Sequence, residues 1–221
     1  FPLSVAIPAF IADLPEPVQV GSCVSRALKA LDLPKDAPVF AAGHSLGAVM
    51  IQDYVFKHSG TFRGLVLMGG ALQRKYRNGT ASHNYPLPWL VLDGTLDGLY
   101  RVTRQAETFY HALGSVDSPN RAQRAVAAQR TAVVIYDGVN HMQFASGTPP
   151  ATVAANDLRA EVSDSEAHDK MATTLAAWLG VHVSSSGAAL ELILRQMNET
   201  GQVVAPLTAA LQKEGFAHFL P

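Results

Sequence analysis

A serine lies between two glycines in the stretch GHSLG, residues 43–47, after the apolar run VFAA and before the helical pattern LGAVMIQDYV. A strained turn from a strand into a helix would raise the Ser45 hydroxyl above a sheet, and Gly43 and Gly47 would let the flanking backbone pass closely. Because the helix begins at this turn, its free N–H groups favour negative charge, and we expect the Leu46 amide to be an oxyanion donor. The pattern therefore predicts a nucleophilic serine.

Two polar residues after later apolar runs supply the partners that such a serine needs. A serine hydroxyl becomes nucleophilic when a base takes its proton, and an acid must orient that base. Asp97 follows the run WLVLD in the turn GTLDG, and His141 follows TAVVIYD in the turn GVNH. Loops at the carboxyl ends of parallel strands meet at one sheet edge, so we expect Ser45, Asp97 and His141 to act together. Asp93 and Asp137 are competing acids, but each lies within or at the end of a strand, which favours a structural role.

Apolar and aromatic residues flank the three predicted catalytic positions. Such a lining predicts a pocket for an uncharged, apolar substrate. The expected lining residues are His44, Leu99, Tyr100, Met142 and Phe144, with Leu46 beside the serine. We expect His44 to pack or to hydrogen-bond beneath the site.

Other histidines receive weaker assignments. His83 and Tyr85, between the second and third apolar runs, could line the entrance or belong to an ordinary solvated loop, and His168 is expected at the surface. No His and carboxylate cluster has metal-ligand spacing, and no Gly-rich phosphate loop is present. The sequence therefore predicts neither a metal nor a nucleotide cofactor.

Four apolar runs predict the strands that position these residues. They span 39–42, 64–69, 89–94 and 131–138, and each is bounded by Gly, Pro or polar residues. Continuous apolarity without alternation is typical of parallel strands buried on both faces. Helical patterns cover 18–32, 46–58, 102–113 and 166–179. The alternation predicts an α/β fold, with a mostly parallel sheet and helices on both faces.

The remaining segments predict loops and a C-terminal helical appendage. Segments 71–88 and 145–165 are rich in turn-forming residues, and the second could roof the site. Residues 184–187 (SSSG) predict a linker, followed by helices at about 188–199 and 203–214, each with one apolar stripe. We therefore divide the 221 residues into a core, 1–183, and a linker with a helical extension, 184–221. The stripes favour packing on the core; the alternative is peripheral membrane contact or dimerisation through 188–221.

Composition excludes several classes of partner. With 17 Lys and Arg against 18 Asp and Glu, the formal charge is −1, which does not favour a nucleic-acid partner. The single Cys23 cannot form an internal disulfide. No apolar run reaches the roughly 18 residues that span a bilayer. Compartment and oligomeric state are left open.

The chain resembles the α/β-hydrolase superfamily from about residue 4 to 182, through GHSLG, GTLDG and GVNH. The resemblance implies a carboxylic-ester hydrolase of the esterase or lipase type, in which Ser45 forms an acyl-enzyme, His141 is the base and Asp97 orients it. The chain is also similar to chlorophyllase-type esterases, which carry GHSRGG, whereas here Leu46 and Ala48 differ. A non-catalytic ligand-binding protein and an acyltransferase with the same triad are the alternatives.

One departure from the family concerns what precedes the serine. In most α/β-hydrolases several strands and a Gly-rich turn with a second oxyanion amide come before the nucleophile, which here stands at residue 45. Only a candidate strand at 4–8 precedes it. We therefore expect the core to lack its first strands, as part of a longer parent chain; the alternative is a site with half its oxyanion hole.

Overall fold

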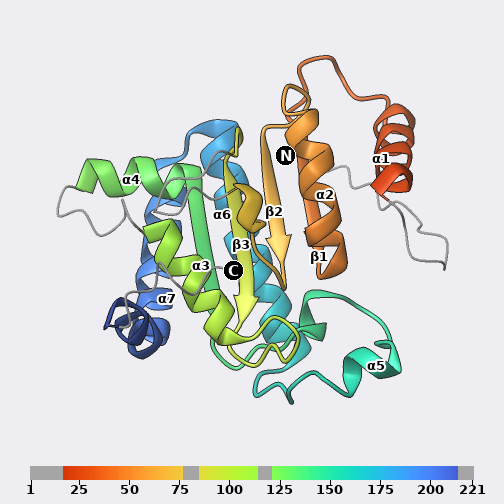
Figure 1. The fold of residues 1–221 in the computed structure, drawn as a ribbon. Coiled ribbons are helices and arrows are strands. Elements are labelled where there is room, and N and C mark those ends of the chain that lie inside the picture. The colour runs from red at the N-terminus through yellow and green to blue at the C-terminus, as the bar shows by residue number, and fades with distance from the viewer. Residues whose placement is uncertain (1–16, 77–84, 114–120, 214–221) are drawn as a thin grey trace.

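A computed structural model describes residues 17–76, 85–113 and 121–213 (Figure 1). The strands are β1 (Phe40–His44), β2 (Gly64–Met68), β3 (Trp89–Gly94) and β4 (Thr131–Tyr136). The helices are α1 (Pro17–Ala30), α2 (Leu46–Lys57), α3 (Val102–Leu113), α4 (Arg121–Arg130), α5 (Ala151–Ala154), α6 (Asp164–Ser184) and α7 (Gly187–Lys213). Two short 3-10 helices, η1 (Arg74–Tyr76) and η2 (Met142–Phe144), lie in loops.

The strands of the described ranges form one parallel sheet in the order β1-β2-β3-β4. All four coincide with the apolar runs to within two residues at each end. Every residue of β3 and β4 is buried, which explains their unbroken apolar pattern, because parallel strands carry helices on both faces. The predicted α/β class with a parallel sheet is confirmed.

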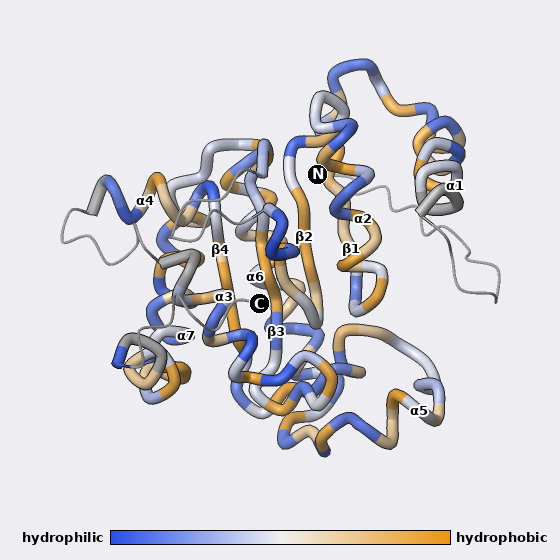
Figure 2. The backbone as a smooth tube through the Cα atoms, viewed as in Figure 1, coloured by the Kyte–Doolittle hydropathy of each residue, from blue (hydrophilic) through white to orange (hydrophobic). Residues whose placement is uncertain are grey.

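Two apolar clusters lie on opposite faces of the sheet. On one face, side chains of β2 and β3 such as Leu65 and Val91 pack with α2 and α3. On the other face, Leu90 and Val134 pack with α6, whose Trp178 is fully buried. Figure 1 shows the sheet between these helices, and Figure 2 shows hydrophobic colouring along β2 and β4. The sheet therefore holds its carboxyl ends, where the predicted site lies, on a rigid base.

The C-terminal segment departs from the predicted linker and two separate helices. Helix α6 continues to Ser184, and only Ser185 and Ser186 separate it from α7, a single helix with Pro206 inside it. Ser185 takes a left-handed φ of 52°, which turns the chain, and the Ser186 hydroxyl accepts from Ala189 N at 3.3 Å. These serines therefore end one helix and start the next.

Helix α7 packs against the sheet and contributes side chains to both apolar clusters. Its apolar residues Ile193, Met197 and Val204 are at most 1% exposed, and they join both clusters. Ile135 N of β4 donates to Thr200 Oγ1 at 3.0 Å. These three side chains therefore pack on the core, which is the placement that the apolar stripes favour.

Other differences fall in polar segments. Helix α4, RAQRAVAAQR, was not predicted because its sequence carries only a weak apolar stripe. The loop 145–165 contains the short α5, and the loop 71–88 contains η1. The candidate strand 4–8 and His83 lie outside the described residues. Among the described helices, none has the length and apolarity to cross a membrane.

Candidate active site

Ser45 occupies a strained turn between β1 and α2. Its φ of 54° and ψ of −122° lie outside the regions that side-chain-bearing residues normally adopt. Such strain persists where surrounding structure fixes it, and here Ser45 N donates to Met68 O of β2 at 2.9 Å. The Ser45 side chain makes no capping bond to α2. The predicted strand-to-helix turn is thus present, with the hydroxyl unused by the helix.

The two glycines of the motif have different roles. A Cβ added to Gly43 would lie 2.5 Å from Gly47 O and 2.6 Å from Gly47 C, so the turn excludes any side chain there. A Cβ on Gly47 would meet nothing within 4 Å. The steric prediction is therefore supported for Gly43 and wrong for Gly47, which contributes its backbone rather than its lack of a side chain.

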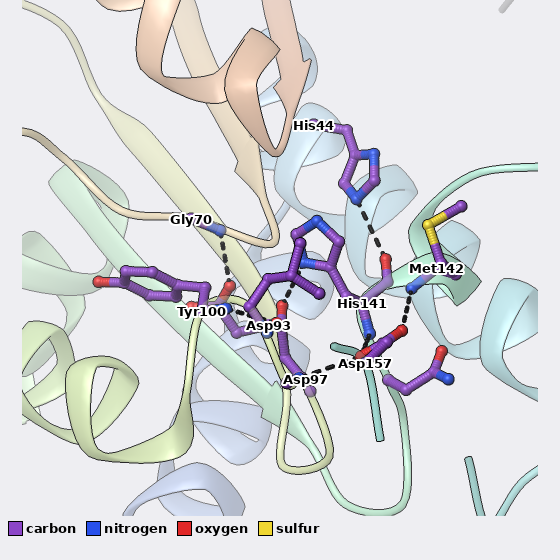
Figure 3. A network of polar contacts seen from close by, with 12 residues as sticks. His44, Gly70, Asp93, Asp97, Tyr100, His141, Met142 and Asp157 are labelled. Atoms are coloured by element: carbon purple, nitrogen blue, oxygen red, sulfur yellow. Dashed lines mark hydrogen bonds and ion pairs between the residues drawn. The ribbon is translucent and has the colours of Figure 1, made fainter. Parts of the chain in front are cut away.

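Asp97 and His141 form a buried pair at the ends of β3 and β4 (Figure 3). Asp97 Oδ2 lies 2.6 Å from His141 Nδ1, and each residue is 1% exposed. Asp97 Oδ1 accepts from Leu99 N at 2.8 Å and from Tyr100 N at 2.6 Å. The acid is thus held by its own turn, and its second oxygen fixes the orientation of the imidazole.

The end of β2 brings Ser45 and His141 into one neighbourhood. Ser45 N bonds to Met68 O, and the next residue, Gly69, has a φ of 56°. A Cβ on Gly69 would lie 2.9 Å from His141 Cε1 and Nδ1, so this glycine makes room for the ring. His141 Nε2 is buried and has no hydrogen-bond partner among the described residues. Nε2 is therefore the unused acceptor that a general base needs.

His44 hydrogen-bonds to the main chain of His141, the predicted base (Figure 3). Its Nε2 donates to His141 O at 3.1 Å, and the two rings lie 4.7 Å apart. Phe144 also stacks on His44, with 6.1 Å between ring centroids. Burial and, secondarily, the charge of His141 lower the pKa of His44. A neutral imidazole has one N–H, and the bond to His141 O places it on Nε2.

The competing acids do not reach His141 Nδ1. Asp93 is fully buried; its Oδ1 accepts from Gly70 N at 3.0 Å, and its Oδ2 has no partner in the part of the chain that the structure describes. Burial and, secondarily, the charge of Asp97 raise the pKa of Asp93 well above its usual value. Asp137 is exposed and accepts from Thr95 Oγ1 at 3.0 Å. Both contacts agree with the structural roles predicted for these residues.

Asp93 gives a testable pH dependence of stability. Folding raises its pKa, so its stabilising contribution is complete below the unfolded value near 4 and declines as pH rises toward the folded pKa. Asp93→Asn removes this titration, so its unfolding free energy relative to wild type should increase from pH 5 to pH 8. The slope can reach about 1.4 kcal/mol per pH unit.

Urea unfolding at four pH values measures this difference. Asp169→Asn, at an exposed position on α6, is the control and should show a difference independent of pH. A pH-independent difference for Asp93→Asn would contradict an acid that is neutral in the folded chain.

The expected pocket residues separate into two groups. Leu46 is 50% exposed and Leu99 is 39% exposed, while Met142 is half-buried. Phe144 is buried against His44, and the Tyr100 hydroxyl lies 2.9 Å from Thr108 Oγ1 of α3. The first three side chains are therefore available to a ligand, whereas the last two contribute mainly to packing.

Two further histidine and tyrosine predictions have different outcomes. Tyr85 does not line an entrance, because it is fully buried and its hydroxyl donates to Gln52 O at 2.8 Å. His168 is exposed on α6, as predicted. Within the described ranges, no group of three or more His, Cys, Asp or Glu is arranged to hold a metal ion.

Sequence reasoning missed Asp157, which contacts the turns of both Asp97 and His141. Its carboxylate accepts from Gly98 N at 3.0 Å, from His141 N at 3.2 Å and from Met142 N at 3.0 Å. An aspartate in a loop rich in polar residues carries no pattern that would single it out. The partners of its carboxylate are defined by the fold.

The evidence for the function of this chain comes from the site residues described above. No protein-family model matches the chain, and no curated protein matches its sequence.

Proposed function

We propose that the chain is a serine hydrolase of the α/β-hydrolase type that cleaves a carboxylic ester of an apolar substrate. The observation that carries the proposal is the buried Asp97–His141 pair, joined at 2.6 Å, beside the strained Ser45 turn. Supporting it, the three residues come from loops at the carboxyl ends of β1, β3 and β4 in one parallel sheet. This chain order and placement are those of the Ser-Asp-His triad on such a sheet.

The proposed reaction proceeds through an acyl-enzyme. Ser45 Oγ attacks the ester carbonyl carbon while its proton passes to His141 Nε2. The negative oxygen of the tetrahedral intermediate accepts from Leu46 N, since the first amides of α2 have no acceptor within the helix. The intermediate collapses as the alcohol leaves with the proton from His141. Water, activated by the same histidine, then releases the carboxylic acid and restores Ser45.

An apolar acyl group or alcohol fits the residues at this edge. Leu46 follows the serine directly, and Leu99 lies two residues after the acid; both side chains are exposed large hydrophobics. Covering them with an apolar ligand would remove their surface from water at a gain of about 25 cal/mol per Å². This is the support for an uncharged, apolar ester over a charged substrate.

A fluorophosphonate probe tests the proposal. The phosphonate should form a covalent bond to Ser45, which mass spectrometry of the digested protein locates. In parallel, p-nitrophenyl esters of increasing acyl length should be hydrolysed with kcat/KM rising toward longer chains, as each buried methylene contributes about 0.8 kcal/mol. Adding a competing alcohol separates hydrolysis from acyl transfer, because a transferase forms the new ester. A folded chain that neither reacts with the probe nor turns over any ester would refute the catalytic proposal and leave a ligand-binding protein.

A further inference from the structure

The segment that follows the proposed base folds back over it. Residues 150–157 form α5 and a turn, and the chain then returns toward η2 before α6 begins. Asn140 Nδ2 donates to Leu158 O at 2.7 Å, and Glu161 N donates to Gly138 O at 2.9 Å. The segment is therefore attached to the turn that carries His141.

Asp157 is the point at which this segment reaches both functional turns. Its Oδ1 accepts from Gly98 N, in the turn of the acid, and from His141 N, in the turn of the base, at 3.0 and 3.2 Å. Its Oδ2 accepts from Met142 N at 3.0 Å (Figure 3). Oδ1 also accepts from Leu158 N at 3.0 Å, which fixes the carboxylate relative to its own backbone.

The contact with the acid turn is sterically close. A Cβ on Gly98 would lie 2.1 Å from Asn156 O and 2.7 Å from Asp157 Cα, so this position admits only glycine. Nearer the sheet, the same two turns are joined by Leu96 N, which donates to Val139 O at 3.0 Å. Farther from the sheet, the Asp157 carboxylate connects the two turns, because it accepts from Gly98 N in one turn and from His141 N in the other.

We infer that Asp157 is a positioning residue that holds the turn of Asp97 and the turn of His141 in the register that the reaction requires. The inference rests on the proposed function. Its physical basis is that hydrogen bonds to a charged acceptor are about twice as strong as neutral ones, and that a displacement of about 1 Å can cost roughly 100-fold in rate. Asp157 touches the main chain of the base and not its ring, so it acts through His141.

Two variants test the inference on the full chain. Asp157→Ala removes every acceptor and should lower kcat for a p-nitrophenyl ester by roughly 100-fold with KM nearly unchanged. Asp157→Asn keeps one carbonyl oxygen and should recover only part of that loss, leaving kcat about tenfold below wild type with KM nearly unchanged. Hydrogen exchange should become faster at the amides of Gly98 and Met142 in the Ala variant and stay unchanged at Ser45.

A control variant distinguishes the positioning of the two turns by Asp157 from a contribution of Asp157 to the stability of the whole fold. Glu161→Gln removes an exposed carboxylate from the same segment and should leave kcat and amide exchange as in wild type. If Asp157→Ala does not fold, the split between kcat and KM in Asp157→Asn carries the test. Turnover at the wild-type rate in a folded Asp157 variant would overturn the positioning role alone. A wild-type chain that does not react with the fluorophosphonate would overturn the proposed function instead.

Discussion

Replacing Ser45 with alanine is expected to lower kcat for ester hydrolysis by about 10⁶-fold and to abolish covalent labelling by a fluorophosphonate. The reason is that no acyl-enzyme can form without the hydroxyl, and the remaining groups only bind and polarise the ester. Ser165→Ala is the matched control, because Ser165 is an exposed serine in the first turn of α6. It should label and turn over as wild type does.

Asp97→Asn extends the same prediction to the orienting acid. The Leu99 and Tyr100 amides need the side-chain oxygen as acceptor, so the asparagine NH2 faces His141 Nδ1. The ring proton must then move to Nε2, which costs about 10⁴-fold in kcat in a triad of this kind. Because the residues act as a unit, the double variant with Ser45→Ala should be no slower than Ser45→Ala alone. Rates measured at a fixed ester concentration well above KM decide both points. Effects that multiply in the double variant would contradict a shared mechanism.

Gly43→Ala is expected to destabilise the fold, whereas Gly47→Ala in the same motif is not. The methyl group added by Gly43→Ala would meet backbone atoms at 2.5 and 2.6 Å, which cannot move without opening the turn that holds Ser45. Overpacking of this kind costs about 1 to 3 kcal/mol or more. A Cβ at position 47 lies in open space on α2, where alanine favours the helix by up to about 1 kcal/mol over glycine.

Thermal and urea unfolding of the two variants measure the difference. The substitutions are chemically identical and lie four residues apart, so each is the control for the other. In a folded Gly43→Ala protein, the rate of fluorophosphonate labelling should also fall, because the Ser45 backbone shifts. Equal stability of the two variants would show that the turn does not have the described geometry.

The strands and the Asp97–His141 pair could be predicted from the sequence because each is indicated by a short, continuous stretch of residues. Strands buried on both faces need unbroken apolar runs, and β3 and β4 have them in WLVLDG and TAVVIY. Asp97 and His141 each follow such a run, where parallel strands present their loops. Asp93 lies inside β3, and its carboxylate accepts from Gly70 N rather than contacting His141, which agrees with the structural role predicted for it.

The features that were missed depend on contacts between distant residues. The continuity of α7 past Gly201 and Pro206 follows from its packing: a Cβ on Gly201 would lie 3.3 Å from Phe109, and Thr200 bonds to β4. Helix α4 has a polar sequence with little apolar periodicity. The role of Gly47 and the contacts of Asp157 depend on where the backbone passes in three dimensions. None of these leaves a short-range pattern in the sequence.

The packing of α7 on β4 also has a consequence for how the chain folds during its synthesis. A parallel strand with an open edge is a template for pairing with another chain, and β4 is entirely buried in the finished fold. During synthesis, residues 131–136 emerge well before Ile193, Met197, Thr200 and Val204, which cover them. The sheet therefore passes through an interval in which an apolar edge is open to misassembly with neighbouring nascent chains. That interval ends only when α7 has docked on β4.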